Sequence, residues 1–362
     1  MQRLRAAAQA LGAAPEAGAP RREVWRDRRC ALYRYTPVRA ALLRTPLLIC
    51  YALVNRPTML DLQPGHSLIR NLLEAGVDVY LLDWGYPRSG DRFEQLDDYV
   101  NGWLRECVGQ VSQGAGREAA DPRPRDVPVN LLGVCQGGAL SLCYASLHPA
   151  QVRNLITMVT PVDFQTPNDL LSRWAQDVDL DLLTSLGNVP GTLLNAVYLS
   201  LMPFRLTQQK YLSLARLLED EQALAHFLRM ERWILDSPDQ AACAFGQFVK
   251  WFYQENRLQR GTLSLGDRPV DLRAIRCPVF NVYGLKDHLV PPDASRALRG
   301  LTTSVDYQEL AVDAGHIGLY VSRAAQTEVA PTSDVSGGAA FQAALRVCAS
   351  CRSTYCKMPP WR

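Results

Sequence analysis

The feature that most constrains the fold is a cysteine bracketed by glycines, in the segment Gly-Val-Cys-Gln-Gly-Gly at residues 133–138. A short apolar run of strand type precedes it, and a helical pattern begins at about Ala139. A sharp strand-to-helix turn of this kind raises its central residue above a sheet edge, and glycines relieve the crowding around it. The segment therefore predicts a nucleophile elbow, with Cys135 as nucleophile and Gly133, Gly137 and Gly138 as the glycines that the turn requires.

Beyond this segment, short apolar runs alternate with helical stretches from residue 46 onward. The strand-like runs are residues 46–52, 77–83, 128–134, 155–160 and 278–283. Helical spacing occurs over residues 67–75 and 96–111, and the polar, Pro-rich residues 112–126 predict a surface loop. This alternation predicts an α/β fold with a mostly parallel, doubly wound sheet and helices on both faces.

The strand pattern stops between residues 165 and 268, where the chain is aromatic-rich and helical or loop-like. These residues predict a helical cap inserted between two strands, although an extra helical layer explains the pattern equally well. The predicted organisation is a leader (1–23), a first core part (24–164), the cap (165–268), a second core part (269–323) and an atypical tail (324–362). The tail cysteines Cys348, Cys351 and Cys356 lack a fourth ligand for zinc.

Composition excludes several classes of function. The 362 residues include 39 basic and 36 acidic ones, a balance that provides no general field for nucleic acid. Ten cysteines in so long a chain indicate reduced thiols rather than a disulfide framework. The longest apolar run, residues 47–54, is far shorter than the roughly 20 residues that span a bilayer. We therefore expect a cytoplasmic protein with no nucleic-acid partner.

A nucleophile at an elbow needs a base and an acid that orients the base, in the chain order nucleophile, acid, histidine. His316 lies in a Gly-bracketed loop after an apolar run, and Asp287 follows the strand-like run at 278–283. We predict these two as base and acid. Of the other histidines, His148 reads as a surface residue at a helix end, His226 as part of a solvated helix face, and His288 as a residue that shapes the Asp287 loop.

Together these segments resemble the polyhydroxyalkanoate synthases. The resemblance rests on residues 133–138, 287–292 and 315–318, and on further motifs such as Asp-Trp-Gly-Tyr-Pro at 83–87 and Thr-Pro-Val-Asp-Phe at 160–164. It extends over roughly residues 24 to 323. The chain lacks the long N-terminal domain of single-subunit synthases and is similar in size to the short catalytic subunits of the class III and class IV types.

The resemblance implies an α/β-hydrolase fold and an acyltransferase that polymerises 3-hydroxyacyl-CoA, most simply 3-hydroxybutyryl-CoA, with release of coenzyme A. Cys135 would carry the growing chain as a thioester and His316 would remove the thiol proton. Asp287 would orient His316 or help to activate the substrate 3-hydroxyl. The backbone N–H groups of Gln136 and Val54 would bind the oxyanion. No cofactor or metal is implied, because coenzyme A belongs to the substrate.

The same resemblance implies partners and a location. They are the growing polyester, the surface of polyhydroxyalkanoate granules in the cytoplasm, a second non-catalytic subunit of the PhaE or PhaR kind, and a homodimer or hetero-oligomer. Two alternatives remain open on the residues alone: a cysteine hydrolase that cleaves thioesters, esters or lactones, and a non-catalytic granule-associated subunit. The tail after residue 323 departs from the family pattern and reads as divergent or frameshifted.

Overall fold

An eight-stranded sheet forms the centre of the structure, a computed structural model that describes residues 18–40, 45–118, 127–201 and 220–321. The strand order is β1-β2-β6-β3-β7-β8-β11-β12. The strands are β1 (Arg21–Asp27), β2 (Cys30–Tyr35), β3 (Leu47–Cys50), β6 (Val79–Asp83), β7 (Val129–Val134), β8 (Val152–Met158), β11 (Val279–Gly284) and β12 (Tyr307–Val312). All neighbours from β6 to β12 are parallel, whereas β1 pairs antiparallel with β2, and β2 pairs antiparallel with β6. The predicted mostly parallel sheet is confirmed.

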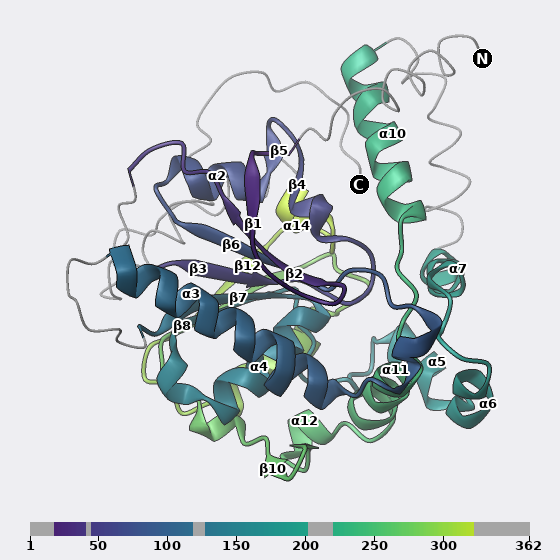
Figure 1. The fold of residues 1–362 in the computed structure, drawn as a ribbon. Coiled ribbons are helices and arrows are strands. Elements are labelled where there is room, and N and C mark those ends of the chain that lie inside the picture. Colours follow the sequence, from purple (N-terminus) through teal and green to yellow (C-terminus); the bar gives the residue numbers. More distant parts are fainter. Residues whose placement is uncertain (1–17, 41–44, 119–126, 202–219, 322–362) are drawn as a thin grey trace.

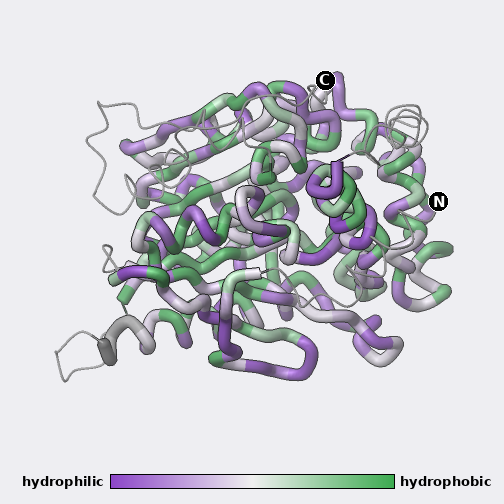
Figure 2. Tube along the Cα trace, turned by 90° about the horizontal axis from the view of Figure 1, so that it is seen from above, coloured by the Kyte–Doolittle hydropathy of each residue, from purple (hydrophilic) through white to green (hydrophobic). Residues whose placement is uncertain are grey.

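Helices cover both faces of this sheet (Figure 1). Their bounds are α2 (Leu68–Glu74) and α14 (Gly318–Val321) on one face, and a π-helix (Asp98–Leu104), α3 (Arg105–Glu118) and α4 (Gln136–Leu147) on the other. Strand β3 shows the alternation: Leu48 and Cys50 pack with α3 and α4, whereas Leu47 and Ile49 pack with α2 and α14. The strand is apolar throughout because both of its faces are buried. Figure 2 shows hydrophobic stretches among the central segments and hydrophilic stretches in peripheral loops.

The segment between β8 and β11 forms a group of helices to one side of the sheet (Figure 1). They are α5 (Leu170–Gln176), α6 (Leu180–Ser185), α7 (Gly191–Leu201), α10 (Glu221–Leu235), α11 (Ala242–Phe248), a π-helix (Val249–Gln254) and α12 (Arg257–Arg260). A short hairpin of β9 (Ser264–Leu265) and β10 (Arg268–Pro269) follows. We call residues 165–268 the cap, as in the sequence prediction.

Short elements connect the larger ones. They are β4 (Asp61–Gln63), β5 (His66–Ser67), α13 (Pro292–Arg296) and 3-10 helices at Pro57–Leu60, Ser89–Phe93, Pro149–Gln151, Leu272–Ala274 and Ala297–Gly300. No helix in the described ranges is long and apolar enough to cross a membrane.

Two parts of the fold differ from the sequence prediction. Strand β1 begins at Arg21, three residues before the predicted start of the core, and neither β1 nor β2 was expected; β1 is exposed along most of its length and so carries no apolar run. Helix α3 continues to Glu118, whereas a loop was predicted from residue 112, because the first proline that could end the helix is Pro122. The predictions for residues 1–17 and 324–362, with their three tail cysteines, fall outside the described residues.

Candidate active site

The candidate nucleophile lies on a strained turn. Cys135 joins β7 to α4 with φ 55° and ψ −124°, a conformation that residues with a Cβ rarely adopt. Its N–H donates to the Met158 carbonyl at 2.9 Å, and its own carbonyl accepts from the Gly138 N–H at 2.9 Å. These bonds keep the backbone of Cys135 in its strained conformation. The Cys135 side chain is half-buried at the C-terminal edge of the sheet.

The glycines of the turn allow three backbone segments to meet. A Cβ on Gly137 would lie 2.5 Å from the Tyr51 carbonyl oxygen and would overlap that of Cys50. A Cβ on Gly138 would overlap the Thr160 side chain, and one on Gly133 would lie 2.9 Å from the Gly137 carbonyl. Helix α4 therefore begins in direct contact with the loops that follow β3 and β8, and any larger residue would push them apart.

The predicted acid and base are bonded to each other. His316 Nδ1 and Asp287 Oδ2 are 2.7 Å apart, and both residues are buried, with 5% and 6% of their surface exposed. The other Asp287 oxygen accepts from the N–H groups of Leu289 and Val290, each at 2.9 Å. Because an ionised carboxylate only accepts, Nδ1 of His316 donates this bond, and Nε2 is the ring nitrogen that can exchange a proton with a neighbouring group.

Backbone bonds hold the Asp287 and His316 loops together. Beyond the paired strands β11 and β12, the Leu285 N–H donates to the Val312 carbonyl at 2.8 Å and the Lys286 N–H donates to the Ala314 carbonyl at 3.0 Å. A Cβ on Gly284 would overlap this Ala314 carbonyl. The two loops thus leave adjacent parallel strands at the same edge as Cys135, which is where doubly wound sheets place their sites.

The electrostatics connect His316 to both predicted partners. Burial by itself lowers the pKa of His316, but the charges of Asp287 and Cys135, together with hydrogen bonds to both side chains, raise this pKa well above its usual value. An imidazole that gains a proton more readily is a better base toward a neighbouring thiol. The structure therefore brings Cys135, His316 and Asp287 into one constellation of nucleophile, base and acid.

The predicted oxyanion donors come from two adjacent strands. Gln136 opens α4 directly after Cys135, and Val54 lies in the loop at residues 51–56, which follows β3. Strands β3 and β7 pair directly, with Cys50 opposite Gly133. Within the described ranges, no residue accepts a hydrogen bond from the N–H of Val54 or of Gln136. Both donors are thus available at the crevice where the strand order reverses.

Comparisons with known proteins agree with this geometry. A family model described as the alpha/beta hydrolase fold matches residues 45–322. The chain is 54% identical over 315 residues to the poly(3-hydroxyalkanoate) polymerase subunit PhaC of Allochromatium vinosum, covering 86% of each chain. It is 48% identical over 320 residues to the subunit of the same name from Synechocystis, covering 86% of this chain and 82% of that one. The chain belongs to the PhaC family. The family and the α/β-hydrolase fold predicted from the sequence are thereby confirmed.

Four tyrosines of this PhaC-family chain lie near enough to the nucleophile for its charge to act on them, and the sequence analysis did not single them out. They are Tyr51, Tyr198, Tyr253 and Tyr320. Burial raises the pKa of each phenol, and the charge of Cys135 adds to the rise in every case. The hydroxyls of Tyr51 and Tyr320 are 3.3 Å apart, so they connect the loop after β3 to α14. The position of Tyr51 directly after a buried strand is the one sequence signal that could have indicated it.

The remaining histidines lie outside the constellation. His148 caps the C-terminus of α4, with Nε2 at 3.0 Å from Asn101 Oδ1, and burial beside Arg268 and Arg105 lowers its pKa to about 4. His226, predicted on a solvated helix face, is half-buried: its ring lies tilted against that of His66, with 4.5 Å between centroids. Among the described residues, no cluster of three or more His, Cys, Asp or Glu side chains could hold a metal.

Proposed function

We propose that this chain is the catalytic subunit of a poly(3-hydroxyalkanoate) polymerase and that it polymerises 3-hydroxyacyl-CoA, with 3-hydroxybutyryl-CoA as the simplest substrate. The observation that carries the proposal is the Cys135–His316–Asp287 constellation at the elbow of a PhaC-family chain. All three chemical groups are present, which disfavours a non-catalytic subunit, and the 48–54% identity extends far beyond the constellation, which disfavours a general cysteine hydrolase.

The first half-reaction loads the enzyme. His316 Nε2 takes the proton of the Cys135 thiol, and the thiolate attacks the thioester carbonyl of the hydroxyacyl-CoA. The oxyanion of the tetrahedral intermediate is bound by the N–H groups of Val54 and Gln136. The carbon–sulfur bond to coenzyme A then breaks, and the leaving thiolate takes the proton from His316. The products are free coenzyme A and an acyl group on Cys135.

The second half-reaction lengthens the chain. The 3-hydroxyl of another hydroxyacyl-CoA attacks the acyl-Cys135 carbonyl while His316 accepts its proton, so that an ester bond forms and the bond to Sγ breaks. The lengthened chain, still a coenzyme A thioester at its other end, then reloads Cys135. Asp287 keeps His316 in the required tautomer throughout. Because water would release the acyl group, the cap over the site would favour transfer over hydrolysis.

The proposal includes the assembly and the location of the enzyme. We infer a second, non-catalytic subunit of the PhaE or PhaR kind, a homodimer or hetero-oligomer as the working form, and cytoplasmic granules of the polyester as the site of action. The support is the family membership and the relatives' description as a subunit. Co-purification from cells that accumulate polyester, followed by size measurement of the complex, tests these points.

The deciding experiment incubates the purified chain with 3-hydroxybutyryl-CoA, with and without a second subunit. Release of coenzyme A and formation of insoluble polymer are followed together. The proposal predicts that both rise in proportion. Free 3-hydroxybutyrate without polymer would instead identify a hydrolase, and no turnover under either condition would identify a non-catalytic subunit.

A further inference from the structure

We propose that Gln240, which belongs to the cap, is a positioning residue for the oxyanion donor at Val54. The inference rests on the polymerase function proposed above, because it concerns the donor that the acyl-transfer chemistry uses. Gln240 does not reach the reacting atoms. It would act by holding one peptide unit of the loop at residues 51–56 in a single orientation.

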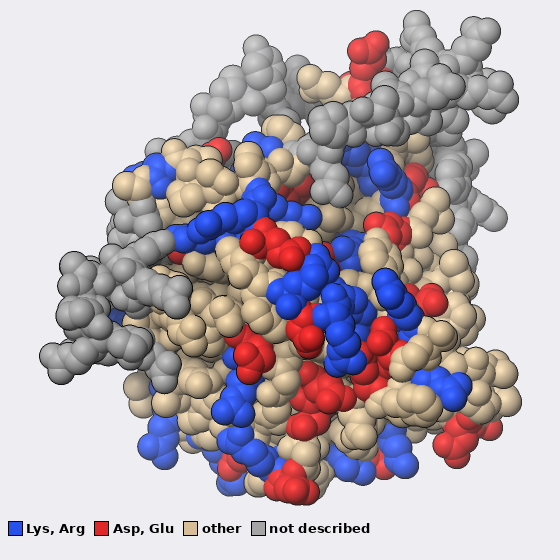
Figure 3. All heavy atoms as spheres, viewed as in Figure 1, with Lys and Arg blue, Asp and Glu red and all other residues tan. Residues whose placement is uncertain are grey.

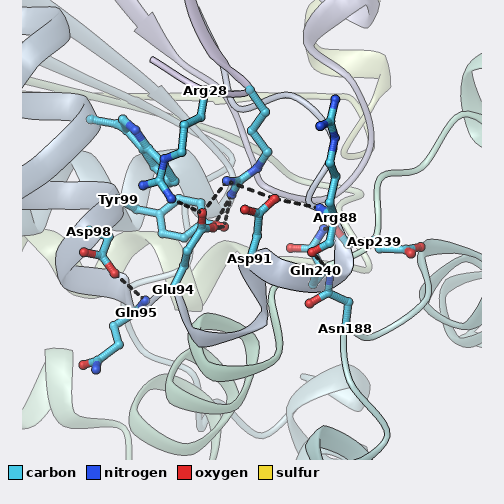
Figure 4. A network of polar contacts seen from close by, with 12 residues as sticks. Arg28, Arg88, Asp91, Glu94, Gln95, Asp98, Tyr99, Asn188, Asp239 and Gln240 are labelled. Atoms are coloured by element: carbon cyan, nitrogen blue, oxygen red, sulfur yellow. Dashed lines mark hydrogen bonds and ion pairs between the residues drawn. The ribbon is translucent and has the colours of Figure 1, made fainter.

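The contact is a buried hydrogen bond between the cap and this loop. Gln240 Nε2 donates to the Leu53 carbonyl at 2.9 Å, and only 6% of the Gln240 surface is exposed. The Gln240 backbone is fixed in turn by a two-way pairing with Val189, with N–O distances of 2.8 and 2.9 Å. In Figure 4, Gln240 lies beside Asn188, whose side chain donates to the Arg88 carbonyl of the core at 2.8 Å. The donor therefore comes from a well-anchored part of the cap.

Because of the geometry of the peptide bond, the hydrogen bond to the Leu53 carbonyl also sets the direction of the Val54 N–H. The Leu53 carbonyl and the Val54 N–H belong to the same planar, trans peptide unit, in which C=O and N–H point in opposite directions. When Gln240 fixes the direction of the Leu53 carbonyl, it also fixes the direction of the Val54 N–H. Among the described residues, none accepts a hydrogen bond from that N–H.

Two other described side chains donate hydrogen bonds to carbonyls of the same loop, and they show why Gln240 is distinct. Trp84 from the core donates its indole N–H to the Tyr51 carbonyl at 2.9 Å. Trp233 from cap helix α10 donates its indole N–H to the Arg56 carbonyl at 2.7 Å. The peptide unit that follows Arg56 ends at Pro57, which has no N–H. The Trp233 bond thus attaches cap to loop without orienting a donor, and it provides a matched control.

The Gln240 contact makes one of the two oxyanion donors depend on the position of the cap. Because the Val54 N–H takes its direction from a cap side chain, the oxyanion site is complete only while the cap is seated on the loop. The donor of Gln136, in contrast, belongs to the elbow itself and does not depend on the cap. A chain with a displaced cap would retain its nucleophile and base and lose one of two oxyanion donors.

The test compares Gln240→Met with Trp233→Phe in the full chain. Each variant removes one cap-to-loop hydrogen bond and keeps a side chain of similar size. Loss of a whole oxyanion donor lowers kcat by about 10²- to 10³-fold, so we expect misorientation by Gln240→Met to lower kcat about 10- to 100-fold. KM and the rate of Cys135 alkylation by iodoacetamide should stay near wild-type values, because binding and thiol activation do not use Val54. Trp233→Phe should keep kcat within about threefold.

The kcat per folded molecule, with the folded fraction taken from urea unfolding, guards against a folding defect in Gln240→Met, and Gln240→Leu, which also cannot donate, should show the same loss of kcat. Equal kcat values for the Gln240 and Trp233 variants, whether high or low, would overturn the inference while wild-type turnover still supports the polymerase. A wild-type chain that releases no coenzyme A would overturn the proposed function and this inference with it.

Discussion

Two polar clusters at the sheet are built differently: the constellation at the elbow and the ion network at the turn of the β1–β2 hairpin. In the network, Arg29 donates to Glu94 at 2.7 Å and to the Tyr99 hydroxyl at 2.7 Å, and Arg28 lies 3.5 Å from the same carboxylate. Figure 4 shows Arg28, Glu94 and Tyr99 close together, with Asp91 alongside, and Figure 3 shows acidic and basic residues interspersed over this face. Each charge there is matched by a charge of opposite sign.

In the elbow cluster, the polar groups are not all paired with one another. His316 is held on one side by Asp287, and its other nitrogen faces a thiol that a substrate can reach because Cys135 is only half-buried. The two arginines of the network form the turn between the antiparallel strands β1 and β2, whereas the elbow cluster lies where parallel strands end and loops from several strands converge. Both clusters are buried and paired, but only the elbow cluster places a nitrogen that can exchange protons beside a nucleophile.

The largest expected effect separates two cysteines of the same strand–helix unit. Cys135→Ala should lower polymer formation by more than about 10⁴-fold, because the residual rate would come from binding alone. Cys143→Ala should retain the activity per folded molecule, since Cys143 is fully buried in α4 and burial raises the pKa of its thiol to about 12. The coenzyme A release assay measures both. A similar loss in both variants would remove Cys135 from the role of nucleophile.

The next largest effect is expected for Asp287→Asn. An amide N–H facing Nδ1 would favour the tautomer with its proton on Nε2, which cannot accept from the thiol. We expect kcat/KM to fall about 10²- to 10⁴-fold with the fold intact. The control is Asp313→Asn, three residues before His316, whose carboxylate is exposed. An effect of comparable size at Asp313 would argue against a specific role for Asp287.

Sequence reasoning could find the parts of this arrangement that follow from chain-local patterns. The elbow is contained in six consecutive residues, and Asp287 and His316 each follow an apolar run, so all three positions could be predicted. The cap-to-loop contacts could not, because Gln240 and Leu53 are 187 residues apart and neither has a distinctive neighbourhood. Strand β1 was missed for a physical reason of another kind, since an exposed edge strand needs no apolar alternation.

In the hairpin network, Glu94→Ala should affect stability and leave chemistry unchanged. Only 8% of the Arg29 side chain and 7% of the Glu94 side chain are exposed, so the variant leaves a buried guanidinium without its nearest carboxylate. Breaking such a pair costs about 3–5 kcal/mol in the free energy of unfolding. Urea unfolding measures this cost, and kcat of the folded fraction should stay within about threefold. A large fall in kcat at unchanged stability would contradict the comparison.

A smaller and pH-dependent effect is expected at His316. Its pKa is raised well above the usual 6.5, so the folded chain holds a proton that the unfolded chain loses. The stabilisation is fully present below about pH 6.5 and is lost as the pH rises through the folded-state pKa. Urea unfolding over a pH series measures the free energy of unfolding of the wild type and of His316→Gln. The value for the wild type minus the value for His316→Gln should therefore fall as the pH increases. An opposite slope would mean that burial dominates at His316.

The smallest effect should come from the ion pair that joins the Asp287 loop to the His316 loop. Lys286 Nζ lies 2.7 Å from Asp313 Oδ2, but 59% and 55% of the two side chains are exposed. Exposed pairs contribute about 0–1 kcal/mol, and the same two loops are already joined by the Lys286 N–H bond to Ala314, which a side-chain change leaves intact. Lys286→Ala should therefore change the free energy of unfolding by less than about 0.5 kcal/mol, and kcat by less than twofold. A loss comparable to that of Glu94→Ala would show that the charge on this loop, and not its backbone pairing, places His316 beside Cys135.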